Sequence, residues 1–189
     1  MKLIYKGKYS GDESSLPSAQ PVEGAVAYRE ASNMKEFALL VNGIALGLMV
    51  LCLILLFVRG GLRAFRVWGY VLSMLALFPH ELLHGICFRE EVYLYTNWKQ
   101  GMLFVTGTEH MSKGRFIFMS LLPNLVFGIL PFLIFLLAPA HTVLGTMGAI
   151  SIGMGAGDYY NVYNTLMQVP KGGRVYNKGF HSYWYVPEK

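Results

Sequence analysis

Charged residues are scarce in this sequence of 189 residues. Asp, Glu, Lys and Arg make up 14% of it and hydrophobic residues 54%, whereas a soluble globular domain typically has about 25% charged residues. The low charge argues against a soluble domain and indicates lipid as the solvent for much of the chain. The net charge of +5 fits the cytoplasmic loops of a membrane protein, and no basic helix is suited to DNA, so we expect no nucleic-acid partner.

Cysteine is also scarce, which argues against an extracellular disulfide framework. The two cysteines, Cys52 and Cys87, both fall within long apolar runs, where a cysteine is ordinarily a small packing residue. The first 35 residues are polar and contain Pro17 and Pro21. The first apolar run begins too late and runs too long for a cleaved secretory signal, so we expect it to remain as a transmembrane helix.

Long apolar runs are abundant. Four of them have the roughly 20 residues that cross a hydrocarbon core about 30 Å thick, at 37–58, 67–88, 116–137 and 143–168. Between the second and third runs, β-prone residues at 92–96 and 102–106 flank a polar segment at 97–101 that ends in glycine, a pattern typical of a hairpin. We therefore predict an all-α membrane protein of four transmembrane helices with a β-hairpin between the second and third.

The distribution of basic residues predicts the orientation of this protein. A polar N-terminal segment at 1–36 and a tail at 169–189 flank the transmembrane domain at 37–168. Thirteen Lys and Arg lie on the side of the membrane that holds the termini, and three lie on the opposite side. Those three, Arg59, Arg63 and Arg66, are clustered in one loop and by themselves favour the opposite orientation. Because cytoplasmic loops carry the excess of positive charge, we expect an integral protein of a bacterial plasma membrane with both termini in the cytoplasm.

Few ionisable side chains interrupt the apolar runs. Glu81 and Asp158 are the only acids within them, and His80 and His84 are the accompanying imidazoles. A carboxylate near the bilayer interior costs at least about 2.5 to 3.5 kcal/mol. These residues therefore need a compensating partner or a function, and a bound divalent cation provides both.

The spacing of His80, Glu81 and His84 points to zinc chemistry. Histidines at i and i+4 lie one turn apart on one face of a helix and can bind one metal ion, while the glutamate beside them reaches a metal-bound water. Zinc in hydrolases takes three protein ligands and keeps the fourth position for water, so a third ligand must come from elsewhere. Pro79, directly before His80, is expected to loosen the preceding helical turn.

Asp158 is the expected third ligand, because it is the other acid within the apolar runs. It follows a stripe of small residues at a spacing of four, namely Gly145, Ala149, Gly153 and Gly157. Such a stripe lets helices approach closely, as a short aspartate needs in order to reach a metal ion on a neighbouring helix. The alternative is that Asp158 is a polar helix partner of Asn161 or Asn124.

Two asparagines are candidates for supporting roles. Asn161 lies one turn after Asp158 and is placed to orient it or to bind a substrate carbonyl. Asn124 follows Pro123, and we expect it to satisfy a backbone group that this proline leaves unbonded. Ordinary solvated side chains are expected for the remaining histidines, His110, His141 and His181.

Two segments, FPHELLHG at 78–85 and GDYYN at 157–161, resemble those of the putative zincin peptidases, a family of membrane proteins with an HExxH motif. The resemblance covers nearly the whole chain, including the N-terminal segment, the hairpin and the aromatic tail. It implies a zinc-dependent intramembrane or membrane-associated peptidase acting on a membrane protein or peptide. His80, His84 and Asp158 would then be the zinc ligands and Glu81 the general base.

More distantly, the chain is similar to the site-2 intramembrane metalloproteases, which hold an HExxH helix and a later aspartate-bearing helix in a three-helix core. It departs from them around the aspartate. Those enzymes carry an Asn-Pro-Asp-Gly type motif, whereas here Gly157 precedes Asp158 and Tyr159 follows it. The ligand is kept, but the helix distortion that proline provides is missing.

Two other functions are compatible with the sequence. A non-catalytic metal-binding membrane protein, such as a carrier, a sensor or an inactive relative, would use the same ligands, although a carrier usually needs further ligands along a path. A structural membrane protein would use the polar cluster to hold helices together. Iron also suits two histidines and a carboxylate, but the glutamate between the histidines has its ordinary use in zinc hydrolysis.

Overall fold

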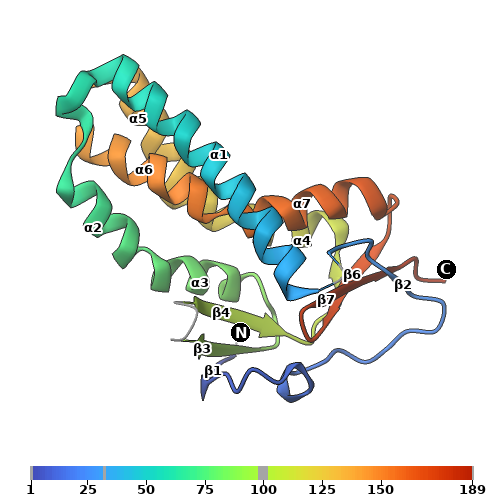
Figure 1. The fold of residues 1–189 in the computed structure, drawn as a ribbon. Coiled ribbons are helices and arrows are strands. Elements are labelled where there is room, and N and C mark those ends of the chain that lie inside the picture. Colours follow the sequence, from blue (N-terminus) through green and yellow to red (C-terminus); the bar gives the residue numbers. More distant parts are fainter. Residues whose placement is uncertain (1, 32, 98–101, 189) are drawn as a thin grey trace. The chain divides into compact units, whose positions relative to one another are not determined.

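The computed structural model describes residues 2–31, 33–97 and 102–188 of the protein (Figure 1). The chain divides into two compact units. The helical unit comprises Glu30–His80 and Ser120–Asn161, and the sheet unit comprises Met1–Arg29, Glu81–Met119 and Val162–Lys189. Since two β-sheets lie among the described residues, the fold is mixed α/β, and the prediction of an all-α protein with four transmembrane helices is wrong.

The helical unit is built around one central helix, α6 (Thr142–Met154). It packs against three others, α1 (Met34–Gly60), α2 (Val67–Leu75) and α5 (Leu130–Leu137). A short 3₁₀ segment, η2 (Gly61–Ala64), follows α1. Helix α1 begins where the Asn33 side chain accepts hydrogen bonds from the main-chain N–H groups of Lys35 and Glu36, which satisfies donors that the first turn leaves unbonded.

Small residues on α6 allow its neighbours to come close, as the sequence predicts. A Cβ added at Gly145 would lie 2.5 Å from the ring of Phe135, and one added at Gly153 would lie 2.9 Å from a side-chain atom of Met49. Ala149 is completely buried. The predicted stripe is therefore confirmed at these three positions, whereas a Cβ at Gly157 would meet nothing within 4 Å.

Two helical stretches are long and apolar enough to cross a membrane, Lys35–Ala64 and Lys113–Leu137. They contain the predicted runs at 37–58 and 116–137. The second stretch consists of α4 (Lys113–Asn124), a π-helical segment η3 (Leu125–Ile129) and α5. Prolines within this stretch, Pro123 and Pro131, lack the N–H that an unbroken α-helix uses.

The other two predicted spans are wrong, because each consists of two shorter helices. The run at 67–88 forms α2 and α3 (Leu77–Ile86), and the run at 143–168 forms α6 and α7 (Ala156–Gln168). Pro79 has no N–H to donate to the carbonyl of Leu75, and the first interruption falls directly after that residue. None of these helices reaches the roughly 20 residues that cross a bilayer unaided.

The sheet unit contains the predicted hairpin. Strands β3 (Glu91–Asn97) and β4 (Met102–Gly107) pair antiparallel, with Val92 opposite Gly107, which confirms the two predicted strands. Of the predicted turn at 97–101, Asn97 ends β3 and residues 98–101 lie outside the described residues. An additional strand, β1 (Lys2–Lys8), pairs parallel to β3 and gives the sheet order β1-β3-β4.

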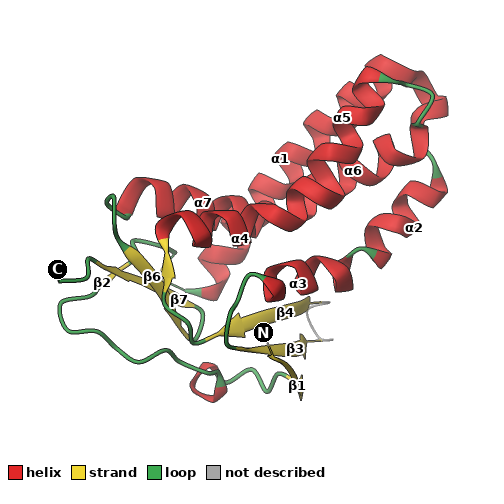
Figure 2. Cartoon of the chain, turned by 180° about the vertical axis from the view of Figure 1, so that it is seen from behind, coloured by secondary structure: helices red, strands yellow, loops and turns green. Residues whose placement is uncertain are grey.

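A second sheet forms from segments that the sequence analysis left without regular structure (Figure 2). Its order is β2-β7-β6-β5. The strands are β2 (Val26–Ala27), β5 (Met111–Ser112), β6 (Arg174–Lys178) and β7 (His181–Tyr185), and a 3₁₀ turn, η1 (Glu13–Ser15), precedes them in the chain. Val175 of β6 is completely buried and packs in one hydrophobic cluster with Met111 and Val92, so the tail belongs to the core of this unit.

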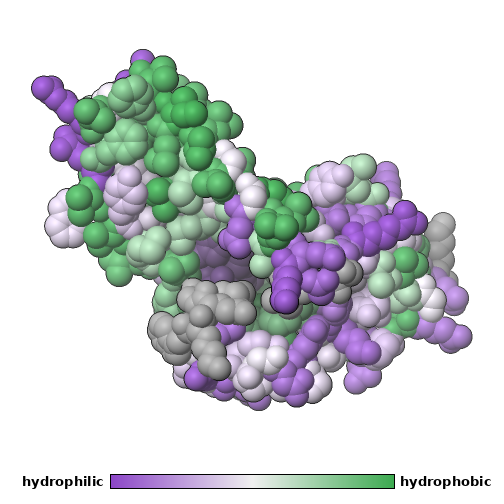
Figure 3. All heavy atoms as spheres, in the orientation of Figure 1, coloured by the Kyte–Doolittle hydropathy of each residue, from purple (hydrophilic) through white to green (hydrophobic). Residues whose placement is uncertain are grey.

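The surfaces of the two units differ in hydropathy. On the face shown in Figure 3, hydrophobic side chains gather over the helical unit and hydrophilic side chains over the sheet unit. Large apolar residues of the helical unit are strongly exposed, among them Leu39 at 79%, Val58 at 76%, Trp68 at 70% and Leu137 at 83%. Contiguous exposed apolar surface of this kind is typical of a face that contacts lipid or another protein.

Candidate metal centre

Helix α3 carries the His-Glu-x-x-His pattern near its centre. One ligand atom from each of His80, Glu81 and His84 lies within 4.8 Å of the others. The helix is regular at this point, because the His80 N–H donates to the carbonyl of Ala76 over 2.8 Å. Both imidazoles therefore lie on one helix face, as their spacing predicts.

The imidazole of His84 is oriented by a main-chain carbonyl of α4. Its side chain is buried, and its Nδ1 lies 2.9 Å from the main-chain oxygen of Met119 in α4. That oxygen lacks its usual helical partner, because the residue four positions later is Pro123, which has no N–H. A carbonyl only accepts hydrogen bonds, so Nδ1 of His84 carries the proton and Nε2 is the nitrogen with a lone pair for a metal ion.

His80, the first histidine of the motif, lies against Asp158. Its Nε2 is 3.2 Å from Oδ2 of Asp158, and the two side chains are only 18% and 16% exposed. Asp158 lies in the first turn of α7, directly after the interruption at Gly155. The interruption thus places Asp158 at the start of a helix, with its carboxylate within reach of His80.

Asn124 positions the Asp158 carboxylate. Its Nδ2 donates to Oδ2 of Asp158 over 2.7 Å and to the main-chain oxygen of Ser120 over 3.1 Å, and the residue is 1% exposed. Asn124 thus bonds a main-chain carbonyl of its own helix, that of Ser120, whereas the carbonyl of Met119, four residues before Pro123, lies 2.9 Å from Nδ1 of His84. The alternative that Asp158 is a polar partner of Asn124 is confirmed, and it is compatible with a role for Asp158 as a ligand.

Gly155 makes room for this asparagine, and the sequence analysis missed it. A Cβ added at Gly155 would lie 1.6 Å from Oδ1 of Asn124, a separation that no side chain tolerates. The signal in the sequence was a glycine three positions before the aspartate, within an otherwise helical run. Any side chain at 155 would displace Asn124 and, with it, the contact to Asp158.

Glu81 contacts the hairpin, a relationship that the sequence did not reveal. Its Oε2 accepts a hydrogen bond of 3.0 Å from the main-chain N–H of Val105 in β4. Because this N–H donates to Glu81, it does not pair with β3, and β4 is at the edge of its sheet. The N–H of Val105 therefore points away from β3. The carboxylate of the HExxH motif therefore lies against the outer edge of a strand.

The remaining candidates lie in different surroundings. Asn161 is half-buried in α7, one turn after Asp158, and His141 and His181 are exposed. His110 differs from the expectation of a solvated histidine, because its ring stacks on Tyr176 at 4.7 Å and its Nδ1 lies 3.1 Å from the Tyr185 hydroxyl. Burial lowers the pKa of His110, which favours its neutral form.

The donor atoms fit a zinc ion. Two imidazoles and a carboxylate are a common ligand set of catalytic zinc sites, and the Nδ1 of His84 already has the backbone partner that such ligands typically use. Nε2 of His80 and Oδ2 of Asp158 lie 3.2 Å apart, so an imidazole and a carboxylate meet at this position.

Comparisons with known proteins agree with this chemistry. No curated protein and no solved structure matches the chain. The model of the family described as "Putative zincin peptidase" matches residues 71–173, which include α3, the hairpin and all of α7. The match covers more than half of the sequence and the whole HExxH motif, and the chain therefore belongs to the family of putative zincin peptidases.

Proposed function

We propose that the protein is a zinc-dependent peptidase of the membrane, with His80, His84 and Asp158 as the zinc ligands. The observation that carries the proposal is the arrangement around α3, where the carbonyl of Met119 orients the imidazole of His84 through Nδ1 and His80 faces Asp158 at 3.2 Å. The compact group of donor atoms consists of His80, Glu81 and His84 and does not contain Asp158. We nevertheless assign the third ligand to Asp158, because its carboxylate lies 3.2 Å from Nε2 of His80, whereas Glu81 accepts a hydrogen bond from Val105 and is kept for the role of base.

Glu81 is the general base of the proposed reaction. His80, His84 and Asp158 would hold the zinc ion, which when bound would supply a Lewis acid for the scissile carbonyl and lower the pKa of the attacking water to about 7. Glu81 accepts a proton from the attacking water and passes it to the leaving nitrogen. The hydrogen bond from Val105 holds one carboxylate oxygen of Glu81 and so orients the carboxylate for this proton transfer.

The outer edge of β4 supports an extended peptide as the substrate. Main-chain groups of an edge strand point alternately toward its partner and away from it. Because the N–H of Val105 points outward, the main-chain groups of Leu103 and Gly107, two positions to either side, also point away from β3. An extended segment can add to such an edge through main-chain hydrogen bonds, with little dependence on its sequence. The added segment would lie beside the base, where its peptide bonds are accessible.

The helical unit supports a membrane location. Two stretches are long and apolar enough to cross a bilayer, and much of the large apolar surface of this unit is exposed. We propose an integral protein of a bacterial plasma membrane, with both termini in the cytoplasm and a membrane protein or peptide as substrate. The excess of basic residues in the terminal segments and the hairpin region supports this orientation.

Substitution of Glu81 tests the proposed function. Glu81→Gln keeps the size of the side chain but removes its basicity, so zinc content should be unchanged and peptide hydrolysis should fall about 10² to 10⁴-fold. Glu23→Gln, an exposed carboxylate, is the matched control and should behave as wild type. The measurement is the zinc content of each purified protein, together with membrane-anchored fragments in cells that express it.

The same experiment separates the peptidase from its alternatives. If cells with Glu81→Gln contain the same fragments as wild type at equal zinc content, the peptidase assignment is wrong. A metal-binding protein without hydrolysis, such as a carrier or a sensor, would then replace it. Absence of zinc from wild type would instead favour a structural role for the polar cluster.

A further inference from the structure

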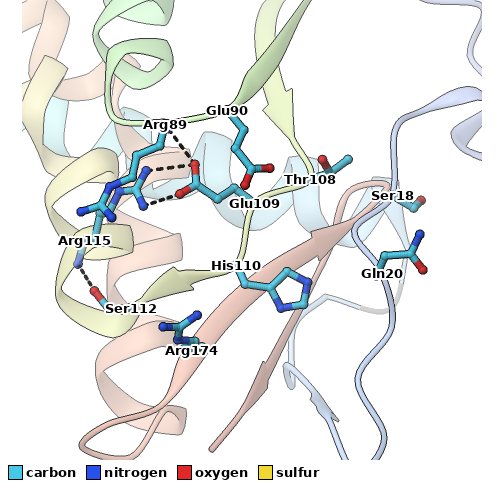
Figure 4. A pocket seen from close by; sticks show the side chains of 10 residues that line it. All are labelled: Ser18, Gln20, Arg89, Glu90, Thr108, Glu109, His110, Ser112, Arg115 and Arg174. Carbon is cyan, nitrogen blue, oxygen red and sulfur yellow. Dashed lines mark hydrogen bonds and ion pairs between the residues drawn. The ribbon is translucent and has the colours of Figure 1, made fainter. Parts of the chain in front are cut away.

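A polar pocket of about 840 Å³ lies within the sheet unit, apart from the residues assigned to zinc (Figure 4). Its walls come from the connection before β3, the connection after β4, the start of α4, strand β6 and the N-terminal segment. Three of its side chains are the guanidinium groups of Arg89, Arg115 and Arg174. In the view of Figure 4 they lie on the opposite side of His110 from Ser18 and Gln20.

Two side chains of the lining, Arg115 and Glu109, form an ion pair. Arg115 donates through Nη1 and Nη2 to the two carboxylate oxygens of Glu109, and Arg89 adds its main-chain N–H to Oε2 over 2.7 Å. Arg115 also donates to the carbonyl of Cys87. The side chains of Arg115 and Glu109 are 20% and 10% exposed. Their opposite charges neutralise each other, so this pair adds no net charge to the pocket.

The two remaining guanidinium groups give the pocket its excess positive charge. Arg89 and Arg174 are both exposed, and within the described part of the chain no acidic side chain forms an ion pair with either of them. Glu90 is the one other acid of the lining. Guanidinium groups bind carboxylates and phosphates through paired hydrogen bonds, so the pocket is suited to an anionic group with two or more oxygens.

The position of the pocket identifies the source of that anion. Thr108, Glu109 and His110 of the lining directly follow β4, and Arg89 and Glu90 directly precede β3. The pocket therefore lies at the end of the edge strand that Glu81 contacts. Thr108 is three positions after Val105, which corresponds to about 10 Å along a strand.

We propose that this pocket binds a carboxylate of the peptide substrate, from an acidic side chain or the chain terminus about three residues from the scissile bond. The inference rests on the proposed function, because the edge of β4 aligns the substrate with both Glu81 and the pocket. Arg89 and Arg174 bind the carboxylate, and the Arg115–Glu109 pair holds the connection that carries Arg89. The enzyme then selects extended segments with an acid at one defined position.

Peptide binding tests this assignment without requiring hydrolysis. The probes are fluorescent nonapeptides of Ser, Thr and Val with a single Glu at successive positions, each paired with a Gln peptide. They are titrated into full-length, zinc-loaded Glu81→Gln protein in detergent, and fluorescence anisotropy is measured. One position of Glu should improve Kd about tenfold over Gln, as expected for a hydrogen-bonded charge pair.

Variants locate the preference in the pocket. Arg89→Gln and Arg174→Gln should each reduce the preference for Glu, and the double variant should abolish it. Arg63→Gln, which removes an exposed arginine of the helical unit, should leave it unchanged. Circular dichroism of each variant confirms that the fold is retained.

Three results would overturn the assignment. They are equal affinity for Glu and Gln peptides at every position, a preference that survives in the double variant, and no binding of any peptide. If vesicles with phosphatidylglycerol, but not phosphatidylcholine, bind the protein through Arg89 and Arg174 while the peptides show no preference, the pocket takes a lipid headgroup and the peptide assignment is wrong. If the preference holds but wild type cleaves nothing, the peptidase function fails and the pocket assignment stands.

Discussion

The Nδ1 of His84 donates a hydrogen bond of 2.9 Å to the main-chain oxygen of Met119, and Pro123 is the reason that this oxygen is available. In an uninterrupted helix the N–H of residue 123 would occupy it. The proline thus couples the backbone of α4 to the orientation of a proposed zinc ligand on α3. The positions of His84 and Pro123 in the sequence do not by themselves indicate that the two residues are linked through the carbonyl of Met119.

Pro123→Ala should weaken zinc binding without removing a ligand. Alanine restores an N–H that competes with His84 for the carbonyl of Met119, so the imidazole loses its fixed orientation. Loss of such a supporting partner typically costs about 10 to 100-fold in metal affinity. Competition with a chromogenic chelator measures the change. Pro131→Ala, in the same helical stretch, is the control, and an equal loss in both variants would contradict the explanation.

Removal of each proposed ligand should remove the metal. Purified wild-type protein should contain about one zinc ion per chain, and His80→Ala, His84→Ala or Asp158→Ala should contain none after dialysis. Elemental analysis of the purified proteins provides the measurement. Full zinc occupancy in Asp158→Ala would show that Asp158 is not the third ligand and would direct attention to Glu81.

Gly155→Ala should disturb the site through Asn124. The added Cβ would overlap Oδ1 of Asn124, which has to move and release its 2.7 Å hydrogen bond to Asp158. We expect zinc affinity to fall by about 10 to 100-fold, as for loss of a supporting partner. Gly157→Ala is the matched control, because its Cβ would meet nothing within 4 Å. Chelator competition measures the zinc affinity of both variants. Unchanged affinity in Gly155→Ala would contradict the role of Asn124 in positioning Asp158.

Acid should destabilise the sheet unit partly through Glu109. Burial by itself would raise the pKa of this carboxyl, but hydrogen bonds from Arg115 and from the main chain of Arg89 outweigh it and hold the pKa below 4.5, the ordinary value. A lowered folded-state pKa contributes stability that is fully present above about pH 4.5 and is lost as pH falls through the folded-state pKa. The melting temperature of wild type should therefore fall more steeply below pH 4.5 than that of Glu109→Gln.

At neutral pH the same variant should be less stable than wild type. Glu109→Gln leaves the guanidinium of Arg115 without its carboxylate in a site that is only 20% exposed, and breaking a buried pair of this kind costs about 3 kcal/mol. Thermal unfolding followed by circular dichroism measures both effects. Parallel pH profiles for wild type and Glu109→Gln would refute the role of this carboxylate.

Cysteine labelling should place both termini in the cytoplasm. In a background with Cys52 and Cys87 replaced by Ala, Ser10→Cys and Lys178→Cys should resist an impermeant thiol reagent in intact cells and react after lysis. Arg63→Cys, between α1 and α2, should react in intact cells. The expectation follows from the excess of basic residues on the side of the termini, and labelling of both terminal cysteines in intact cells would invert the topology.

Several local features of this protein could be predicted from its sequence. The pairing of His80 with His84 depends only on helical periodicity, which is a local property. The hairpin was predictable for a similar reason, because its strands are neighbours in the chain and their β-prone runs flank a polar segment. The stripe on α6 was visible as a spacing of small residues. Each of these predictions required only that residues close in sequence form one regular element.

The tertiary structure alone decided where the helices end and what lies beside the site. Hydropathy measures composition, so it could not show that the interruptions at Ala76 and Gly155 divide two of the four predicted spans. Strand β1 pairs with β3 across almost the whole first half of the chain, and no local pattern marks such a partner. The contacts of Asn124 with Asp158 and of Glu81 with Val105 also join distant segments. Their geometry depends on the packing of whole elements, which spacing along the sequence does not specify.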